Sequence, residues 1–308
     1  MKLFRFVLVL VLSFTAACSD NWLVKNNLTK NIKEQVTYGE DSRQEASQIV
    51  GEKLIQQASA TLALVHVDKI FSEEGPELAL IQTLQKDSKV CSDEAFSQQV
   101  SLAHCTATLI DSDLMLTAAH CFPMESSCEE TKIIPQYTLD RFNAEHEQSI
   151  ELAETYSCKS VEYLQLPETG ADFAFVRLDR KVVGVEPVDI KESREVQAGE
   201  ELYNFSFPAG LPLKMSTGQV RSVELENHFL SEIDVFAGSS GSLVYGTADS
   251  KPLGILVSGE NDFEYDESAQ CFRTRKCANG ECRGEKVLQL EAIHKVMDLI
   301  KNEHPVTY

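Results

Sequence analysis

Short apolar runs separated by polar turns recur along most of this chain. They fall at positions 61–67, 105–110, 114–119, 172–178, 202–207, 218–225, 241–245 and 253–259. The segments between them are polar, and many contain Gly or Pro. Many short strands connected by such turns predict an all-β protein, either a barrel or a sandwich.

The pattern is different at the two ends of the chain. Near the C-terminus, apolar residues recur at helical spacing and predict one amphipathic α-helix; they are Leu290, Ile293, Val296, Met297 and Ile300. Residues 18–48 are polar and show no sustained periodicity. We therefore expect this segment to be a tether or propeptide outside the packed core.

Residues 1–17 have the pattern of a secretory signal peptide. Basic Lys2 and Arg5 precede an apolar run, and small residues stand before Cys18. The run is too short for a stable membrane span. Because Cys18 follows two alanines, the site resembles the lipobox of bacterial lipoproteins, and we predict lipidation of Cys18 and anchoring to a membrane surface. Cleavage after Ala17 by an ordinary signal peptidase is the alternative.

Charge and cysteine content narrow the class of protein. The formal net charge is -20, so a phosphate backbone would be repelled and nucleic-acid binding is not expected. Apart from Cys18, the cysteines form an even set, which suits disulfides in an oxidising compartment. A zinc site is the alternative, but the spacing of Cys271, Cys277 and Cys282 lacks the paired C-x2-C of structural zinc sites. Nothing in the sequence requires a metal or an organic cofactor.

Among the histidines, His120 has the most distinctive neighbours. It lies in "LTAAHC", directly before Cys121, and Cys105 stands at the start of the preceding predicted strand. A bridge between Cys105 and Cys121 would hold the imidazole beside a rigid covalent link. In the chain-entropy account, closing a loop of this size stabilises a fold by roughly 3 kcal/mol.

The stretch "CTATLIDSDLMLTAAHC" resembles the histidine segment of the chymotrypsin/trypsin family of serine peptidases, in which T-A-A-H-C supplies the general base. The resemblance implies that His120 is this base. "GADFAFVRL" is similar to the family's D-I-A-L-L-R-L segment, which implies that Asp172 accepts a hydrogen bond from the imidazole Nδ1–H. Taken alone, Asp172 could instead be an aspartate that ends a turn before a strand.

The stretch "AGSSGSLVY", residues 237–245, is similar to the family's nucleophile pattern, G-x-S-G-[GS] followed by an apolar strand. The match implies that Ser240 is the nucleophile rather than Ser239 or Ser242. It also implies an oxyanion hole formed by the N–H groups of Gly238 and Ser240.

The resemblance extends over about residues 49–301 and implies a fold of two six-stranded antiparallel β-barrels with a C-terminal α-helix. The order histidine, aspartate, serine along the chain is that of the chymotrypsin family. The family's catalytic groups lie in the cleft between the barrels, the histidine and aspartate on the first and the serine on the second. We therefore assign residues 49–308 to a trypsin-like serine peptidase domain.

The sequence departs from the family's activation mechanism. "IVGE", residues 49–52, is similar to the I-V-G-G start of mature members, whose free amine pairs with an aspartate directly before the nucleophile. Here Ser239 stands at that position, Gln48 precedes Ile49, and the nearest preceding arginine is Arg43. We therefore expect that this ion pair does not switch the protein on. "GSSGS" is more similar to the bacterial glutamyl-endopeptidase-like relatives.

Asp234 is a candidate for substrate selection. It lies six residues before Ser240, where trypsin-like members place the carboxylate that selects Lys or Arg. The resemblance implies the same selection here, through a charge-assisted pair with a basic side chain. The alternative is an aspartate at a strand end that faces water.

The sequence thus predicts an exported serine endopeptidase that acts on protein or peptide substrates. It would be secreted or held in the bacterial cell envelope as a lipoprotein. Because a fold does not guarantee activity, a catalytically inactive, protease-like binding lipoprotein of the envelope is a second hypothesis. A structural envelope lipoprotein is a third, but it rests on Cys18 alone and leaves the matched motifs unexplained.

Overall fold

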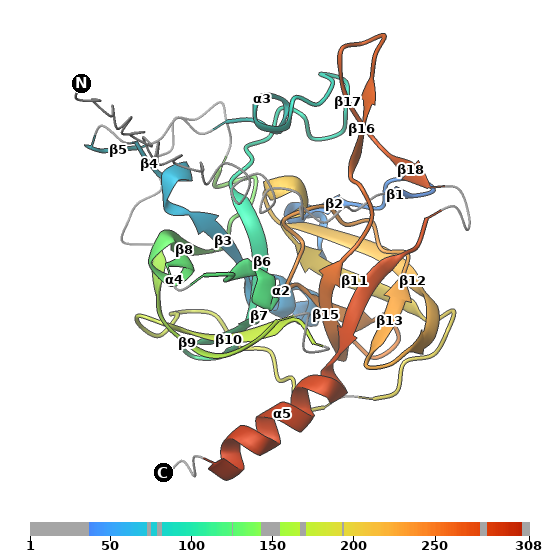
Figure 1. The fold of residues 1–308 in the computed structure, drawn as a ribbon. Helices are drawn as coiled ribbons and strands as arrows, with labels where there is room; N and C mark the ends of the chain where they lie inside the picture. The colour runs from blue at the N-terminus through green and yellow to red at the C-terminus, as the bar shows by residue number, and fades with distance from the viewer. Residues whose placement is uncertain are drawn as a thin grey trace, which may run out of the picture. The chain divides into compact units, whose positions relative to one another are not determined.

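The computed structural model describes residues 37–72, 75–78, 82–124, 126–142, 155–166, 171–192, 194–277 and 282–303 (Figure 1). The predicted signal peptide, Cys18 and residues 18–36 of the predicted tether lie outside the described residues. Among the helices that are described, none combines the length and the apolar character needed to cross a membrane.

Six strands in the first half of the described chain form one closed barrel (Figure 1). They are β3 (Thr61–His66), β6 (Ala103–Asp111), β7 (Leu114–Thr117), β8 (Thr131–Pro135), β9 (Tyr156–Gln165) and β10 (Phe173–Leu178). The strands close in the order β10-β7-β6-β3-β8-β9, and all their pairings are antiparallel. Leu62, Leu109 and Phe173 are fully buried in its core.

The second half forms another barrel. Its strands are β11 (Glu201–Ser206), β12 (Lys214–Leu225), β13 (His228–Ser231), β14 (Leu243–Gly246), β15 (Pro252–Ser258) and β19 (Glu285–Gln289). They follow the order β11-β14-β15-β19-β13-β12, and a further pairing of β11 with β12 closes the ring. The predicted fold of two six-stranded antiparallel barrels is confirmed.

The predicted C-terminal helix is also confirmed. It is α5 (Leu290–Glu303), which follows β19 directly and buries Leu290 and Ile293 completely (Figure 1). The other described helices are short: α2 (Glu52–Ser59), α3 (Leu84–Ser88), α4 (Ser127–Glu130), η1 (Ala46–Gln48), η2 (Val67–Lys69), η3 (Ala119–Cys121) and η6 (Pro208–Gly210).

Further strands lie outside the barrels. They form two antiparallel hairpins and one parallel pair: β4 (Phe71–Ser72) with β5 (Gly75–Leu78), β16 (Phe263–Asp266) with β17 (Cys271–Thr274), and β1 (Thr37–Tyr38) with β18 (Lys276–Cys277). The hairpin β16–β17 follows β15 along the chain, so it connects to the second barrel.

Residues 37–48, which we call the N-terminal segment, differ from the prediction of a loose tether. They contain β1, η1 and β2 (Gln44–Glu45), and β2 adds to the edge of β12 with Lys214 opposite Glu45. The folded domain therefore includes these residues instead of starting at Ile49. The prediction failed because the two strands have two residues each and take their partners from distant parts of the chain, so no local periodicity reveals them.

Disulfides connect all eight cysteines that the structure describes: Cys91–Cys271, Cys105–Cys121, Cys128–Cys158 and Cys277–Cys282. The pair Cys105–Cys121 is the one that the sequence suggested, and the cysteines of the alternative zinc site are used in bridges. Four disulfides indicate an oxidising compartment.

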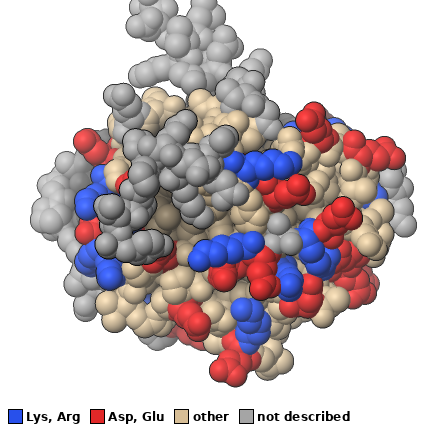
Figure 2. Space-filling view, turned by 90° about the horizontal axis from the view of Figure 1, so that it is seen from below, with Lys and Arg blue, Asp and Glu red and all other residues tan. Residues whose placement is uncertain are grey.

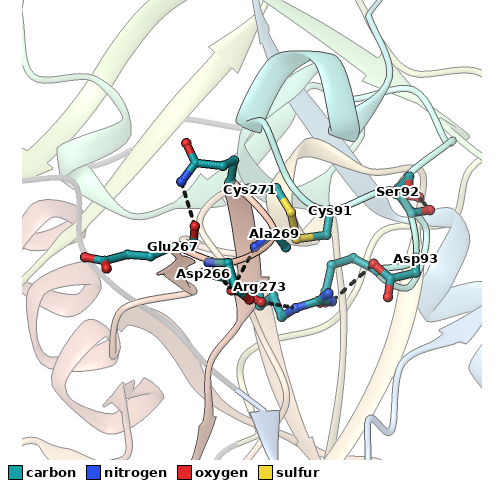
Figure 3. Close-up of a disulfide and its surroundings, with 12 residues drawn as sticks. Cys91, Ser92, Asp93, Asp266, Glu267, Ala269, Cys271 and Arg273 are labelled. Carbon is teal, nitrogen blue, oxygen red and sulfur yellow. Dashed lines mark hydrogen bonds and ion pairs between the residues drawn. A yellow bond between two sulfur atoms is a disulfide. The ribbon is translucent and has the colours of Figure 1, made fainter.

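The bridge between Cys91 and Cys271 joins the loop after α3 to the hairpin β16–β17 (Figure 3). Beside it, the Arg273 guanidinium pairs with three carboxylates, those of Asp93 at 3.1 Å, Glu94 at 3.2 Å and Asp266 at 2.9 Å. The bridge and the ion pairs therefore hold this loop and the hairpin together.

Charged side chains of both signs lie side by side on the face shown in Figure 2. Ion pairs among the described residues include Arg177 Nη1 with Asp113 Oδ1 at 2.8 Å and Arg194 Nε with Asp249 Oδ2 at 2.7 Å. Partly exposed pairs of this kind contribute little to stability. The excess of acidic over basic residues is therefore better explained by a contribution to solubility than by a contribution to stability.

Candidate active site

His120 and Asp172 meet because two neighbouring strands of the first barrel place them at the same end. His120 follows β7 in η3, and Asp172 directly precedes β10, which pairs with β7 through Ala174 opposite Thr117. The Nδ1 atom of His120 lies 2.8 Å from Oδ2 of Asp172, and the His120 main-chain N–H donates to Oδ1 at 3.1 Å. The carboxylate is 3% exposed, so it orients the ring from a site with little water.

Ser240 lies in the loop between β13 and β14. We call residues 234–242 the serine loop. The Ser240 carbonyl accepts the Thr106 N–H at 2.9 Å, and the Sγ atom of Cys121 lies 3.8 Å from the same oxygen. Because Cys121 is adjacent to His120, the serine of the second barrel is brought beside the histidine of the first.

The three serines of this loop have different environments. Ser239 is fully buried and its Oγ accepts the Phe236 N–H at 3.4 Å. Ser242 is also fully buried, and its Oγ accepts a hydrogen bond from Asn204 Nδ2 at 3.1 Å. The Ser240 hydroxyl has no hydrogen-bond partner within the described chain, and the residue is 6% exposed. Ser240 is therefore the serine best placed to react.

Two glycines shape the turn around Ser240. Gly238 and Gly241 have φ values of 96° and 88°, a region that side chains rarely adopt. A Cβ atom on Gly238 would lie 2.5 Å from the Phe207 carbonyl oxygen, and one on Gly241 would lie 2.3 Å from the Thr106 carbonyl oxygen. The turn packs too closely against the backbone of β6 and of Phe207, the residue after β11, for any other residue at these two positions.

The main-chain amides of the turn divide into two groups. The N–H groups of Ser239, Gly241 and Ser242 donate to Phe236, Leu256 and Ser239, at 2.9, 2.7 and 3.1 Å respectively. Those of Gly238 and Ser240, on either side of Ser239, have no partner among the described residues. Two free amides that flank Ser239, on a turn whose other amides are bonded, are available as donors to a negatively charged oxygen.

Thr106 on β6 is a contributor that the sequence analysis missed. Its Oγ1 donates to the Gly238 carbonyl at 2.7 Å, while its N–H donates to the Ser240 carbonyl. The side chain is fully buried. Thr106 therefore clamps the carbonyls on both sides of Ser239 to the first barrel. Its place after Cys105 gave no sign of these partners, because they lie more than a hundred residues along the chain.

Asp234, the predicted selector of basic side chains, contacts the N-terminal segment. Its Oδ1 accepts the Tyr38 N–H at 2.6 Å and its Oδ2 accepts the Ser42 N–H at 2.7 Å. The residue is 2% exposed, and burial raises the pKa of its carboxyl although these hydrogen bonds oppose the rise. Its hydrogen bonds thus join the serine loop to residues 37–48, and its role in substrate selection stays a prediction.

Two six-stranded antiparallel barrels, with a histidine paired to an aspartate on the first and a serine loop on the second, are the arrangement of the chymotrypsin fold. Residues 105–255 match the family described as trypsin-like peptidase domain, so the chain carries a trypsin-like peptidase domain. No curated protein is similar enough in sequence to count as a match.

The fold is shared with at least one protein of solved structure. Human heparin binding protein shares 12% identity with a TM-score of 0.52, covering 85% of this chain and 97% of its own. A Glu endopeptidase shares 15% identity with a TM-score of 0.48, over 87% of this chain and 100% of its own. A serine endoprotease from Yersinia pestis shares 13% identity with a TM-score of 0.46, over 82% of this chain and 67% of its own. At such low identity the likeness to heparin binding protein concerns the fold alone, and the other two likenesses are weaker.

Proposed function

We propose that the protein is an exported serine endopeptidase that cleaves protein or peptide substrates through an acyl-enzyme. The observation that carries the proposal is the 2.8 Å contact between His120 Nδ1 and Asp172 Oδ2, close to a serine whose hydroxyl has no hydrogen-bond partner among the described residues. A nucleophile, a base and an orienting carboxylate on one surface suffice for acyl transfer without a cofactor.

In this mechanism the Ser240 hydroxyl attacks the carbonyl carbon of the scissile peptide bond, and His120 Nε2 takes the hydroxyl proton. The negative charge that develops on the carbonyl oxygen is accepted by the N–H groups of Gly238 and Ser240. His120 then gives its proton to the leaving amine. A water molecule, activated by His120 in the same way, releases the acyl group from Ser240. Asp172 stabilises the imidazolium in both steps.

The disulfides and Cys18 indicate in which compartment the protein acts. Four disulfides suit a protein that folds outside the reducing cytosol. We propose that residues 1–17 direct export and that acylation of Cys18 anchors the mature chain to the bacterial envelope. Mass spectrometry of the purified mature chain tests this: a diacylated or triacylated Cys18 is expected, and an unmodified chain starting at residue 18 would show secretion instead.

An inactive binding protein on the same scaffold is the competing function. One structurally similar protein bears the name heparin binding protein. Heparin is a polyanion, and a net charge of -20 opposes binding to it. All the groups needed for turnover are also present, so catalysis accounts for the site better than binding does.

Labelling with a fluorophosphonate tests the proposal directly, because the probe reacts only with an activated serine. We expect labelling of the mature protein, and we expect Ser240→Ala to abolish it. Ser160→Ala on β9 is the matched control and should label normally, because this hydroxyl contacts Glu162 on the outside of the barrel. A correctly processed, folded protein that takes no label would support the binding scaffold.

A further inference from the structure

The serine loop is attached to the N-terminal segment through its first residue. Asp234 binds the main-chain N–H groups of Tyr38 and Ser42, and the segment is itself held by β1 on β18 and β2 on β12. Both carboxylate oxygens of Asp234 are used in this way. The start of the serine loop therefore rests on chain that precedes Ile49.

Arg43 makes a second connection from the same segment. Its guanidinium forms two bonds with Asp41, Nε to Oδ1 at 2.8 Å and Nη2 to Oδ2 at 2.6 Å, and the residue is 8% exposed. The Cζ atom lies 4.0 Å from the ring centroid of Phe236 and 4.9 Å from that of Phe96. A buried, paired guanidinium between two aromatic rings holds them at a fixed spacing.

Phe236 transmits this contact to the reactive turn. Its carbonyl accepts the Ser239 N–H at 2.9 Å, and its own N–H donates to Ser239 Oγ at 3.4 Å. Ser239 lies between the two free amides of Gly238 and Ser240. The position of the Phe236 backbone thus sets where those amides are presented, and Arg43 packs against the Phe236 ring.

Ile49 has no such connection. Its N–H donates to the Ala46 carbonyl at 3.2 Å, as a main-chain amide in the turn after η1. Its side chain is 9% exposed and packs in the core around the first barrel. The residue before Ser240 is Ser239, which offers no carboxylate to a freed amine.

We infer that Arg43 is a positioning residue for the amides of Gly238 and Ser240, and that the uncleaved N-terminal segment is what orders the serine loop. This inference rests on the proposed function, because the amides matter for catalysis only if the protein is a peptidase. An intact Gln48–Ile49 bond is then compatible with full activity, and loss of residues 37–48 removes activity.

Hydrogen exchange tests the coupling without needing turnover. In a Ser240→Ala background, the amides of residues 235–241 are compared in the parent, Arg43→Met, Arg43→Lys and Arg194→Met. Arg194 is the matched control. It is a partly buried arginine that pairs with Glu200, just before β11, and with Asp249, in the turn after β14. We expect exchange in this peptide to quicken on the order of tenfold in Arg43→Met. It should quicken less in Arg43→Lys, and not at all in Arg194→Met.

The amides of β8, which pairs only with β3 and β9 of the first barrel, report global unfolding and should not change. Unchanged exchange at 235–241 in Arg43→Met overturns the inference, and so does a rise in β8 as large as the rise at 235–241. These results decide the role of Arg43 even if the protein proves to have no peptidase activity, which would overturn the proposed function alone.

Enzyme kinetics test whether Arg43 affects catalysis. With Ser240 present, Arg43→Met should lower kcat for a peptide ester by about 10- to 100-fold, because small displacements of catalytic groups cost this much. KM should stay within about threefold, since the amides act on the transition state and not on the bound substrate. Intact mass of the active parent should show an unbroken 48–49 bond. Activity that appears only after this bond is cut would overturn the inference.

Discussion

Asp172 binds His120 at two points, with Oδ2 2.8 Å from the ring Nδ1 and Oδ1 3.1 Å from the main-chain N–H. The first contact places the ring proton on Nδ1 and leaves Nε2 as the acceptor for a hydroxyl proton. The second fixes the peptide that carries the ring. The carboxylate therefore controls both the tautomer and the position of the imidazole.

Asp172→Asn separates these two contributions. The amide oxygen can still accept the main-chain N–H, but an amide NH2 facing the ring favours the wrong tautomer. We expect kcat on a peptide ester to fall by about 10⁴-fold, with the melting temperature nearly unchanged. Asp113→Asn, which removes one of the two carboxylates that pair with Arg177, is the control and should keep its activity. A loss below tenfold for Asp172→Asn would contradict the assigned role.

Gly238→Ala tests whether the turn needs its close contact with the backbone. The added Cβ would lie 2.5 Å from the Phe207 carbonyl oxygen, so the loop must shift and its free amides with it. We expect kcat to fall by about 10²-fold or more. Gly184→Ala is the matched control. The backbone of Gly184 has a similarly unfavourable φ of 74°, but no atom lies within 4 Å of the position that its Cβ would take. Equal losses of activity in both variants would show that strain, not displacement of the amides, is responsible.

The disulfides should contribute unequally to stability. Cys91–Cys271 spans 180 residues, whereas Cys277–Cys282 spans 5. In the chain-entropy account, replacing both cysteines by serine should cost about 5 kcal/mol for the long bridge and about 2 kcal/mol for the short one. Urea unfolding of the two double variants measures the difference. A larger loss from the short bridge would mean that native contacts, not loop closure, determine what these bridges contribute.

The residues of the candidate site could be located from the sequence because their motifs are local, while their catalytic roles stay a prediction. His120, Asp172 and Ser240 each lie in a short string that resembles a known segment, and the structure brings all three strings to one surface. The two barrels could be predicted for a similar reason, because most of their strands carry a visible apolar run. Strands β8, β9, β13 and β19 were not predicted. In β9 most residues are only partly buried, and its sequence shows no clean alternation.

The supports of the site could not be predicted in this way. Tyr38 and Ser42 reach Asp234 across 196 and 192 residues of chain, and both donate main-chain groups that carry no sequence signal. Arg43 appeared in the sequence only as the arginine nearest to Ile49. Its importance depends on Phe96 and Phe236, which come close to it only in the folded chain. Long-range contacts of polar groups leave no periodicity, so the N-terminal segment looked like a tether.

We expect Glu285 to make the stability of the domain depend on pH, independently of catalysis. The residue is fully buried on β19, and its Oε1 accepts a hydrogen bond from the Tyr38 hydroxyl at 3.0 Å. Burial raises the pKa of this carboxyl well above its ordinary value of 4.5; the Tyr38 hydrogen bond opposes the rise, and the charges of Asp262, Glu260 and Asp234 add to it.

The sign of the effect follows from proton uptake. Above pH 4.5 the unfolded chain ionises at Glu285 while the folded chain keeps the proton, so folding becomes less favourable as the pH rises. Glu285→Gln keeps a neutral acceptor for Tyr38 and cannot ionise. We expect its stability to match the parent below the ordinary pKa, and then to exceed it by up to about 1.4 kcal/mol for each pH unit until the folded pKa is reached. Urea unfolding at mildly acidic and mildly alkaline pH measures this, with the exposed Glu267→Gln as a pH-independent control. A variant less stable than the parent at alkaline pH would show that the folded protein prefers the ionised form of Glu285.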